Sequence, residues 1–160
     1  MRENIKMLIM DVDGTLTDGK IYMGNDGEVL KAFNAKDGYG IHNMLIPNNI
    51  TPVIITGRVS DIVANRCKEL EITELYQGIS DKEKCMEDVV EKYSLSCANV
   101  AYIGDDNNDL SCINRVKKDG GYTGCPMDAS GEVRKISDYV CKLGGGQGAV
   151  REFIETILGV

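Results

Sequence analysis

IKMLIMDVDGTLTDG (residues 5–19) is the stretch of sequence that decides the fold. Residues 5–10 form a short apolar run, and acidic turn-forming residues follow it directly at Asp11 and Asp13. An apolar run of this length bounded by turn residues is typical of a buried strand. We therefore predict a strand over residues 5–10 that delivers two carboxylates to its carboxyl end.

The same pattern of a buried strand followed by polar residues recurs further along the chain. PVIIT (52–56) predicts a second strand that ends at Thr56-Gly57, and NVAYI (99–103) predicts a third that leads into Gly104-Asp105-Asp106. Helical patterns separate these strands. Alternating strands and helices predict an α/β fold, a Rossmann-like three-layer α/β/α arrangement around a central parallel sheet.

Shorter signals complete the expected order of elements. IYMGNDGEVL (21–30) predicts a small β-hairpin, with Asn25-Asp26-Gly27 as its turn. Ser60 is expected to cap one helix, and Ser80 with Glu83 resembles a capping box for the next. Two further strands are expected near 120–124 and 138–142, the second being the better. The last helix takes its apolar face from Val150, Phe153, Ile154, Ile157 and Leu158.

The lengths between the motifs leave no room for a second domain. From Asp18 to Thr56 the chain holds only a hairpin and a helix, and from Thr56 to Lys82 only a helix, a strand and a loop. We therefore expect one domain over residues 1–160, without a separate cap domain. A site on such a domain is open to water unless a neighbouring subunit covers it.

Composition narrows the possible partners. The net charge of −7 argues against nucleic acid, because phosphate backbones need clustered Lys and Arg. The six cysteines form no CxxC pair, which argues against a zinc site and favours reduced thiols in a cytoplasmic protein. No apolar run reaches transmembrane length, so no membrane partner is expected.

Carboxylates and a hydroxyl follow all three buried strands, and parallel strands present such residues at one rim of the sheet. The residues are Asp11, Asp13, Thr56, Asp105, Asp106 and Asp109. Any one of them alone has an ordinary explanation as a turn or helix-cap residue. Together they would repel one another unless a cation lay among them, and oxygen ligands favour magnesium. Lys82, at the start of a predicted helix, is placed to reach an anionic substrate.

At this point the residues match a known family. DVDGTLTDG (11–19), TG (56–57), Lys82 and GDDNND (104–109) resemble, in order and spacing, the four motifs of haloacid dehalogenase superfamily phosphatases. The resemblance narrows to the capless 3-deoxy-D-manno-octulosonate 8-phosphate (KDO 8-phosphate) phosphatases and extends from about Ile5 to Phe153. The stretches that carry it are DGKIYMGNDGEVLKAFNAKDGYGI (18–41), ITGR (55–58), LYQG (75–78), NVAYIGDD (99–106) and GGQGAVREF (145–153).

The resemblance implies a role for each matched residue. Asp11 matches the nucleophile that forms an aspartyl-phosphate, and Asp13 matches the general acid and base. The phosphate-binding positions are Thr56, Gly57 and Lys82. The Mg²⁺ ligands are Asp11, Asp105 and the carbonyl of Asp13, supported by Asp106 and Asp109. The substrate-contacting positions are Asn34, Ala35, Lys36, Asp37, Gly38, His42, Arg58 and Arg66.

The resemblance also implies a substrate and an assembly. It indicates a magnesium-dependent phosphomonoesterase for KDO 8-phosphate in lipopolysaccharide biosynthesis, assembled as a homotetramer through the hairpin. GCPMDA (124–129) and the His42 segment equally resemble relatives that act on nonulosonic (sialic-acid-type) sugars, so N-acylneuraminate or deaminoneuraminate 9-phosphate stays open. GGQG replaces the family's GGRG, which leaves the sugar undecided.

Two other functions are weighed against a sugar-acid phosphatase. One is a broad phosphatase for small metabolites. The other is a non-catalytic oligomerisation module associated with a cytidylyltransferase. A degenerate module is expected to have lost Asp11, Asp13, Lys82 or Asp105, and all four are present.

Overall fold

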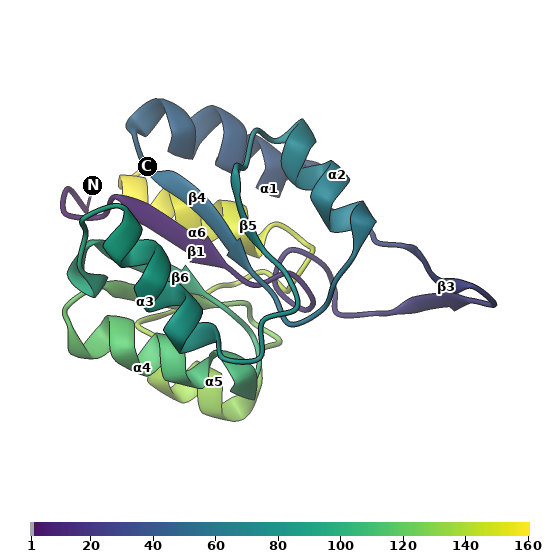
Figure 1. Cartoon of the computed structure of the whole chain (residues 1–160). Coiled ribbons are helices and arrows are strands. Elements are labelled where there is room, and N and C mark those ends of the chain that lie inside the picture. The colour runs from purple at the N-terminus through teal and green to yellow at the C-terminus, as the bar shows by residue number, and fades with distance from the viewer. Residues whose placement is uncertain (1) are drawn as a thin grey trace.

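Six parallel strands form one central sheet in the computed structural model, which describes residues 2–160 (Figure 1). Their order across the sheet is β5-β4-β1-β6-β7-β8, so the chain starts in the middle and builds outward in both directions. The strands are β1 (Met7–Met10), β4 (Thr51–Ile55), β5 (Glu74–Tyr76), β6 (Val100–Ile103), β7 (Tyr122–Cys125) and β8 (Tyr139–Val140). This confirms the predicted parallel α/β sheet.

Helices cover both faces of the sheet (Figure 1). They are α1 (Ala35–Tyr39), α2 (Asp61–Glu69), α3 (Lys82–Lys92), α4 (Leu110–Lys118), α5 (Gly131–Ile136) and α6 (Ala149–Leu158). One core packs α2, α6 and the helical turn Gly40–Leu45 that follows α1 on one face, and a second core packs α3, α4 and α5 on the other. The central strands are apolar at every position and fully buried, because both of their faces are covered.

Several local predictions need correction. Asp81, not Ser80, caps α3, and its side chain accepts a hydrogen bond from the Lys84 amide. Ser60 does precede α2, but its hydroxyl bonds Glu28 rather than the helix. The last two strands are also reversed in strength: β7 has four residues, all buried, whereas β8 has only two residues, neither of them buried. Edge position explains the short β8, since only one neighbour stabilises it.

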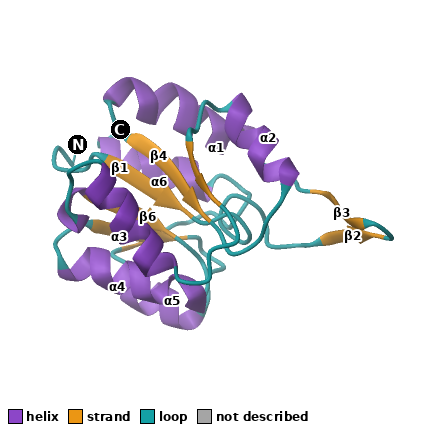
Figure 2. Ribbon diagram, viewed as in Figure 1, coloured by secondary structure: helices purple, strands orange, loops and turns teal. Residues whose placement is uncertain are grey.

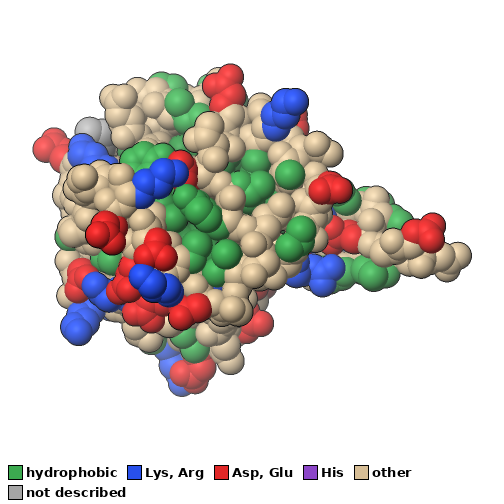
Figure 3. Space-filling view, viewed as in Figure 1, with side chains coloured by type: hydrophobic (Ala, Val, Ile, Leu, Met, Phe, Trp, Pro, Cys, Tyr) green, Lys and Arg blue, Asp and Glu red, His purple; other side chains and the backbone are tan. Residues whose placement is uncertain are grey.

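A two-stranded antiparallel hairpin projects from the body of the molecule (Figure 2). It consists of β2 (Tyr22–Gly24) and β3 (Gly27–Leu30). Gly27 is paired with Gly24 and belongs to the second strand, so the turn is Asn25-Asp26, one residue shorter than predicted. Figure 3 shows hydrophobic side chains on this projection, and Met23 and Val29 are the most exposed of them.

Two predictions made from composition, on membrane segments and on cysteines, can be compared with the structure. None of the helices in residues 2–160 combines the length and the apolar character that crossing a membrane needs. All six cysteines are free thiols, and five of them are buried. The cysteines therefore serve as core residues of this fold.

Candidate active site

A cleft of about 210 Å³ lies beyond the carboxyl ends of the central strands β1, β4 and β6. Parallel strands end at the same edge of the sheet, and this is why residues from three distant segments meet there. The cleft is lined by Asp11, Asp13, Thr56, Gly57, Arg58, Asp105, Asp106 and Asn108. The predicted convergence of the three motifs at one rim is thus present in the structure.

A buried lysine connects two carboxylates at the floor of the cleft. The Nζ of Lys82 lies 3.0 Å from Oδ1 of Asp11 and 2.8 Å from Oδ1 of Asp109. Lys82 is the first residue of α3, and its side chain is 2 % exposed. Burial alone would lower its pKa, but the two carboxylates outweigh burial and raise it. Lys82 is therefore a fixed cation beside Asp11.

Asp109 is fully enclosed by hydrogen-bond donors. Besides Lys82, its Oδ1 accepts a hydrogen bond from the hydroxyl of Tyr102 at 2.7 Å. Its Oδ2 accepts from the backbone amides of Asp105 and Asp106. Both oxygens are occupied in this way, so Asp109 orients Lys82 and the loop after β6 rather than facing the cleft.

Asp11 and Asp105 are crowded acidic groups. Burial raises the pKa of Asp11 to about 6, with a further contribution from Asp109 and an opposing one from Lys82. Burial and the neighbouring Asp11 raise the pKa of Asp105 to about 7. Thr15 donates a hydrogen bond of 3.0 Å to Oδ1 of Asp105. These two carboxylates thus lack enough compensating positive charge.

The donors at this site fit a hard divalent cation. Carboxylate oxygens of Asp11, Asp105 and Asp109 lie within 4.8 Å of one another. Because Asp109 is already saturated by four donors, Asp11 and Asp105 are the two carboxylates free to bind an ion. Such an all-oxygen, negatively charged site is what Mg²⁺ prefers.

Asp13 and the Thr56–Arg58 loop also line the cleft. The Oδ2 of Asp13 lies 3.9 Å from Nε of Arg58. Thr56 is 3 % exposed and directly follows β4, while Gly57 and Arg58 are exposed. Thr56, Gly57 and Arg58 therefore line the same cleft as Asp11 and Asp105.

The predicted substrate contacts are not all brought to this cleft. Arg58 lines it, but Arg66 pairs with Glu69 at 2.8 Å and lies over the ring of Phe33. Asn34, Gly38 and Arg66 line a separate narrow pocket beneath α2. Within one subunit Arg66 is thus turned toward Phe33, and the recognition of one substrate carboxylate by both Arg58 and Arg66 stays a prediction.

The remaining predicted contacts also lie elsewhere in the subunit. Asp37 is 1 % exposed, and its Oδ1 accepts a hydrogen bond from the Arg151 amide in the first turn of α6. His42 lies beside Leu70 at the far end of α2. Ala35 and Lys36 are exposed on α1, where Lys36 lines a different groove along α6. Within one subunit these four residues do not face the cleft.

Sequence reasoning missed two charged residues beside Asp13. Lys31 follows β3, has a side chain only 1 % exposed, and forms ion pairs with Asp13 and Glu28. Glu28 also accepts a hydrogen bond from Ser60 at 2.6 Å. The sequence offers only a Glu and a Lys three residues apart on a hairpin arm, a pattern also typical of a solvent-exposed pair. Tyr102 and Thr15, the partners of Asp109 and Asp105, were missed too.

Comparisons with known proteins show the family to which this chain belongs. Residues 55–154 match the haloacid dehalogenase-like hydrolase family. The chain is 47 % identical over 156 residues to the 3-deoxy-D-manno-octulosonate 8-phosphate phosphatase KdsC of Escherichia coli K12, covering 98 % of this chain and 80 % of that protein. Family membership thus extends over almost the whole chain.

Solved structures show the same fold at comparable similarity. The phosphatase of the same name from Yersinia pestis superposes with a TM-score of 0.92 at 44 % identity, covering 98 % of this chain and 82 % of that one. The Moraxella catarrhalis phosphatase, solved with magnesium, phosphate and KDO, gives a TM-score of 0.91 at 38 % identity, covering 99 % and 88 %. The shared architecture extends over nearly the whole chain.

Proposed function

This chain belongs to the haloacid dehalogenase-like hydrolases and is a phosphatase, and from that premise we propose that it hydrolyses the phosphate monoester of a 2-keto-3-deoxy sugar acid. KDO 8-phosphate is the proposed substrate, supported by the names of the relatives that match nearly its whole length. The observation that carries the reaction is Asp11, paired with buried Lys82 in a cleft that also holds Asp13 and Asp105.

Asp11 is proposed as the nucleophile. Its carboxylate attacks phosphorus, forming an acyl-phosphate as the bond from phosphorus to the sugar oxygen breaks. Lys82 reduces the repulsion between the Asp11 carboxylate and the phosphate dianion, and the Thr56 hydroxyl and the Gly57 amide are proposed to donate hydrogen bonds to phosphate oxygens. The barrier is thus lowered mainly by positioning and charge neutralisation.

Asp13 is proposed as the general acid and base. In the first half-reaction its carboxyl group gives a proton to the leaving sugar oxygen. In the second half-reaction the resulting carboxylate takes a proton from a water molecule as that water attacks phosphorus. Inorganic phosphate then leaves and the Asp11 carboxylate is regenerated, so atoms and protons balance over the cycle.

Asp11, Asp105 and the main-chain carbonyl of Asp13 are the proposed ligands of Mg²⁺, with Asp106 and Asp109 holding the loop behind them. When bound, the ion supplies positive charge that stabilises the phosphate in the transition state. The uncompensated charge of Asp11 and Asp105 supports this assignment.

A homotetramer is proposed as the assembly, with the hairpins of neighbouring subunits closing each other's sites. The support is the exposed apolar surface of the hairpin, where Met23 and Val29 are 62 % and 60 % exposed. In such an assembly Arg66 and His42, which do not face the cleft of their own subunit, become available to a neighbour.

A substrate panel tests the proposed function. The purified chain is assayed for phosphate release from KDO 8-phosphate, N-acetylneuraminate 9-phosphate, deaminoneuraminate 9-phosphate and 4-nitrophenyl phosphate. We expect the highest kcat/KM on KDO 8-phosphate, and Asp11→Asn, which is nearly isosteric, should abolish turnover on all four. A preference for a 9-phosphate would move the assignment to the nonulosonic acids, and Asp11→Asn activity within about tenfold of wild type would refute the nucleophile.

Arg58→Ala tests whether the site recognises a carboxylate. A charge-assisted hydrogen bond from Arg58 to the sugar carboxylate predicts a loss of about tenfold to a hundredfold in kcat/KM on KDO 8-phosphate. 4-Nitrophenyl phosphate has no carboxylate and should be nearly unaffected. Arg134→Ala, which removes an exposed arginine from α5, is the matched control. Equal losses on both substrates would show that Arg58 serves the phosphate or the fold.

A further inference from the structure

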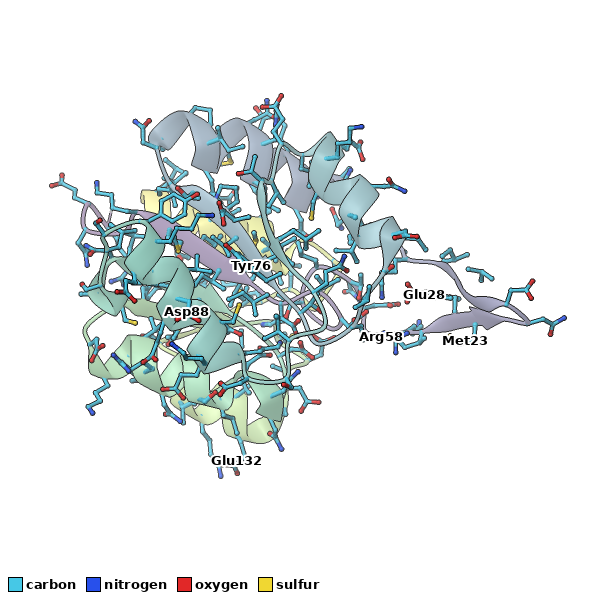
Figure 4. The ribbon with its side chains drawn as sticks, in the orientation of Figure 1. Met23, Glu28, Arg58, Tyr76, Asp88 and Glu132 are labelled. Atoms are coloured by element: carbon cyan, nitrogen blue, oxygen red, sulfur yellow. The ribbon has the colours of Figure 1, made fainter. Side chains whose placement is uncertain are left out.

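A cluster of charged and polar side chains, largely buried except for Arg58, lies where the hairpin joins the body of the molecule. We call it the hairpin-root cluster, and it consists of Asp13, Glu28, Lys31, Arg58 and Ser60. Lys31 ion-pairs with Oδ1 of Asp13, and its Nζ lies 2.8 Å from Oε1 of Glu28. Figure 4 labels Glu28 and Arg58, whose charged groups approach to 3.6 Å at this junction.

The burial of Lys31 calls for an explanation. Its side chain is 1 % exposed, and Asp13 and Glu28 are 19 % and 12 % exposed. Removing an ammonium group from water is costly, and an apolar side chain would anchor a hairpin at least as well. A lysine at this position therefore does something that packing alone does not require.

The two oxygens of Asp13 have different surroundings. Oδ1 is held by Lys31, whereas the cationic partner of Oδ2 within residues 2–160 is Arg58, at 3.9 Å. Asp13 and Arg58 both line the cleft, but Lys31 does not. One oxygen is thus fixed from behind, and the other is left to meet a group that enters the cleft.

We propose that Lys31 is a positioning residue that fixes the Asp13 carboxyl group for proton transfer to the leaving oxygen. This inference rests on the proposed role of Asp13 as general acid. Lys31 itself touches neither the phosphate nor the sugar, because its ammonium group is enclosed by Asp13 and Glu28.

The rest of the cluster sets the position of Lys31. Glu28 lies on β3, and its Oε2 accepts a 2.6 Å hydrogen bond from Ser60, the residue that precedes α2. The Ser60 amide in turn bonds the side chain of Gln77 in the loop after β5. These hydrogen bonds hold the hairpin against the loop after β4, which is proposed to bind phosphate. Lys31 is held in place by Glu28 and in turn fixes the position of the Asp13 carboxylate.

Leaving-group dependence separates a positioning role from a merely structural one. Phenyl phosphate and 4-nitrophenyl phosphate have similar size and no carboxylate, but only the poorer phenolate leaving group needs a proton in the first step. We expect Lys31→Met to lower kcat/KM about a hundredfold for phenyl phosphate and less than about tenfold for 4-nitrophenyl phosphate. The parameter kcat/KM is chosen because it reports the steps up to phosphorylation of Asp11.

A double variant tests whether Lys31 acts through Asp13. In an Asp13→Asn background, Lys31→Met should lower kcat/KM for phenyl phosphate little further, since the carboxyl group that Lys31 positions is already absent. Lys117→Met is the matched control, because it removes another lysine–aspartate pair, with Asp138 at 2.9 Å, at the opposite end of the strands. Lys117→Met should change neither substrate by more than about twofold.

The outcomes that overturn the proposal are distinct from failure of the proposed function. Equal losses on the two aryl phosphates, or additive losses in the double variant, would make Lys31 a structural anchor only. A wild-type protein that hydrolyses neither aryl phosphate nor KDO 8-phosphate would instead refute the phosphatase mechanism. If Lys31→Met does not fold by circular dichroism, Glu28→Gln takes its place. Glu28→Gln should lower kcat/KM more for phenyl phosphate than for 4-nitrophenyl phosphate, by a smaller ratio than Lys31→Met. An equal loss on the two substrates would overturn the proposal.

Discussion

Asp109 illustrates at the scale of single residues how the site is held. Its carboxylate receives Lys82, Tyr102 and two backbone amides, and it is completely buried. A buried carboxylate needs such saturation, because each unpaired oxygen would carry a desolvation cost. Asp109 therefore determines where Lys82 points, and Lys82 in turn lies beside Asp11.

Gly14 has a left-handed backbone conformation and lies directly against Asp105. Its φ is +94°, and a Cβ placed there would lie 2.0 Å from Oδ2 of Asp105. We expect Gly14→Ala to displace Asp105, destabilise the fold by roughly 2–4 kcal/mol and lower kcat/KM more than about a hundredfold. Thermal unfolding and steady-state kinetics measure the two effects.

Gly120 provides the control for the Gly14 prediction. Its φ of +88° is similar, but a Cβ there would meet no atom within 4 Å. Gly120→Ala should therefore show the backbone cost alone, roughly 1–2 kcal/mol, with kcat/KM unchanged. If both alanine variants lose activity equally, close approach to Asp105 is not what Gly14 provides.

At the scale of elements, α1 and α6 are joined by one buried carboxylate. Asp37 on α1 accepts a hydrogen bond from the Arg151 amide, and its Oδ2 has no hydrogen-bond partner among residues 2–160. Burial raises the pKa of Asp37 to about 6, against the lowering effect of backbone amides at the start of α6. The two helices are thus connected through a carboxylate that is costly to ionise.

This pKa predicts a pH-dependent difference in stability. A folded-state pKa above the ordinary value of 3.8 means that the folded state binds the proton more tightly. The resulting penalty is absent below pH 3.8, grows as pH rises, and is complete above about pH 6. Asp37→Asn keeps an acceptor oxygen but no charge. Its unfolding free energy, relative to that of wild type, should rise by about 2 kcal/mol as the pH is raised from about 4.5 to about 7.5.

Urea denaturation at the two pH values measures this difference in unfolding free energy. Asp26→Asn, in the exposed hairpin turn, is the control, and its unfolding free energy should equal that of wild type at both pH values. A constant offset between Asp37→Asn and wild type would mean that Asp37 titrates normally in the folded protein.

At the scale of the whole molecule, the cation is expected to stabilise the fold as well as the reaction. Activity should require Mg²⁺ and disappear with chelator, and Ca²⁺ should support it poorly because its coordination shell is larger and looser. Saturating Mg²⁺ should add about 2.7 kcal/mol at a hundredfold excess over Kd, or roughly 5–10 °C in Tm. Asp105→Asn should lose that shift, whereas full activity of metal-free protein in chelator would contradict the role of magnesium.

The hairpin gives a second prediction at this scale. Met23→Lys combined with Val29→Lys places charge on the exposed apolar surface of the hairpin, and we expect the proposed tetramer to dissociate to monomers in light scattering. Val160→Lys, at an exposed apolar residue far along the chain, is the control and should leave the mass unchanged. A wild-type protein that is monomeric at micromolar concentration would contradict the proposed assembly.

Much of the fold could be predicted from local pattern. Apolar runs such as residues 5–10 and 99–103 predicted buried parallel strands, since a strand covered on both faces is apolar at every position. Turn residues after each run indicated where the strands end. Parallel strands end at one edge, so the meeting of Asp11, Thr56 and Asp105 followed from the topology.

Only the tertiary structure decided which side chains face the cleft and which turn inward. Arg58 precedes α2 and Arg66 lies within it, yet the first lines the cleft and the second packs on Phe33. Lys31 has the sequence context of a solvent-exposed hairpin lysine, yet its ammonium group is buried against Asp13. The physical reason is that the burial and pairing of a charge depend on partners distant in sequence, whereas strand and helix patterns depend on neighbours along the chain.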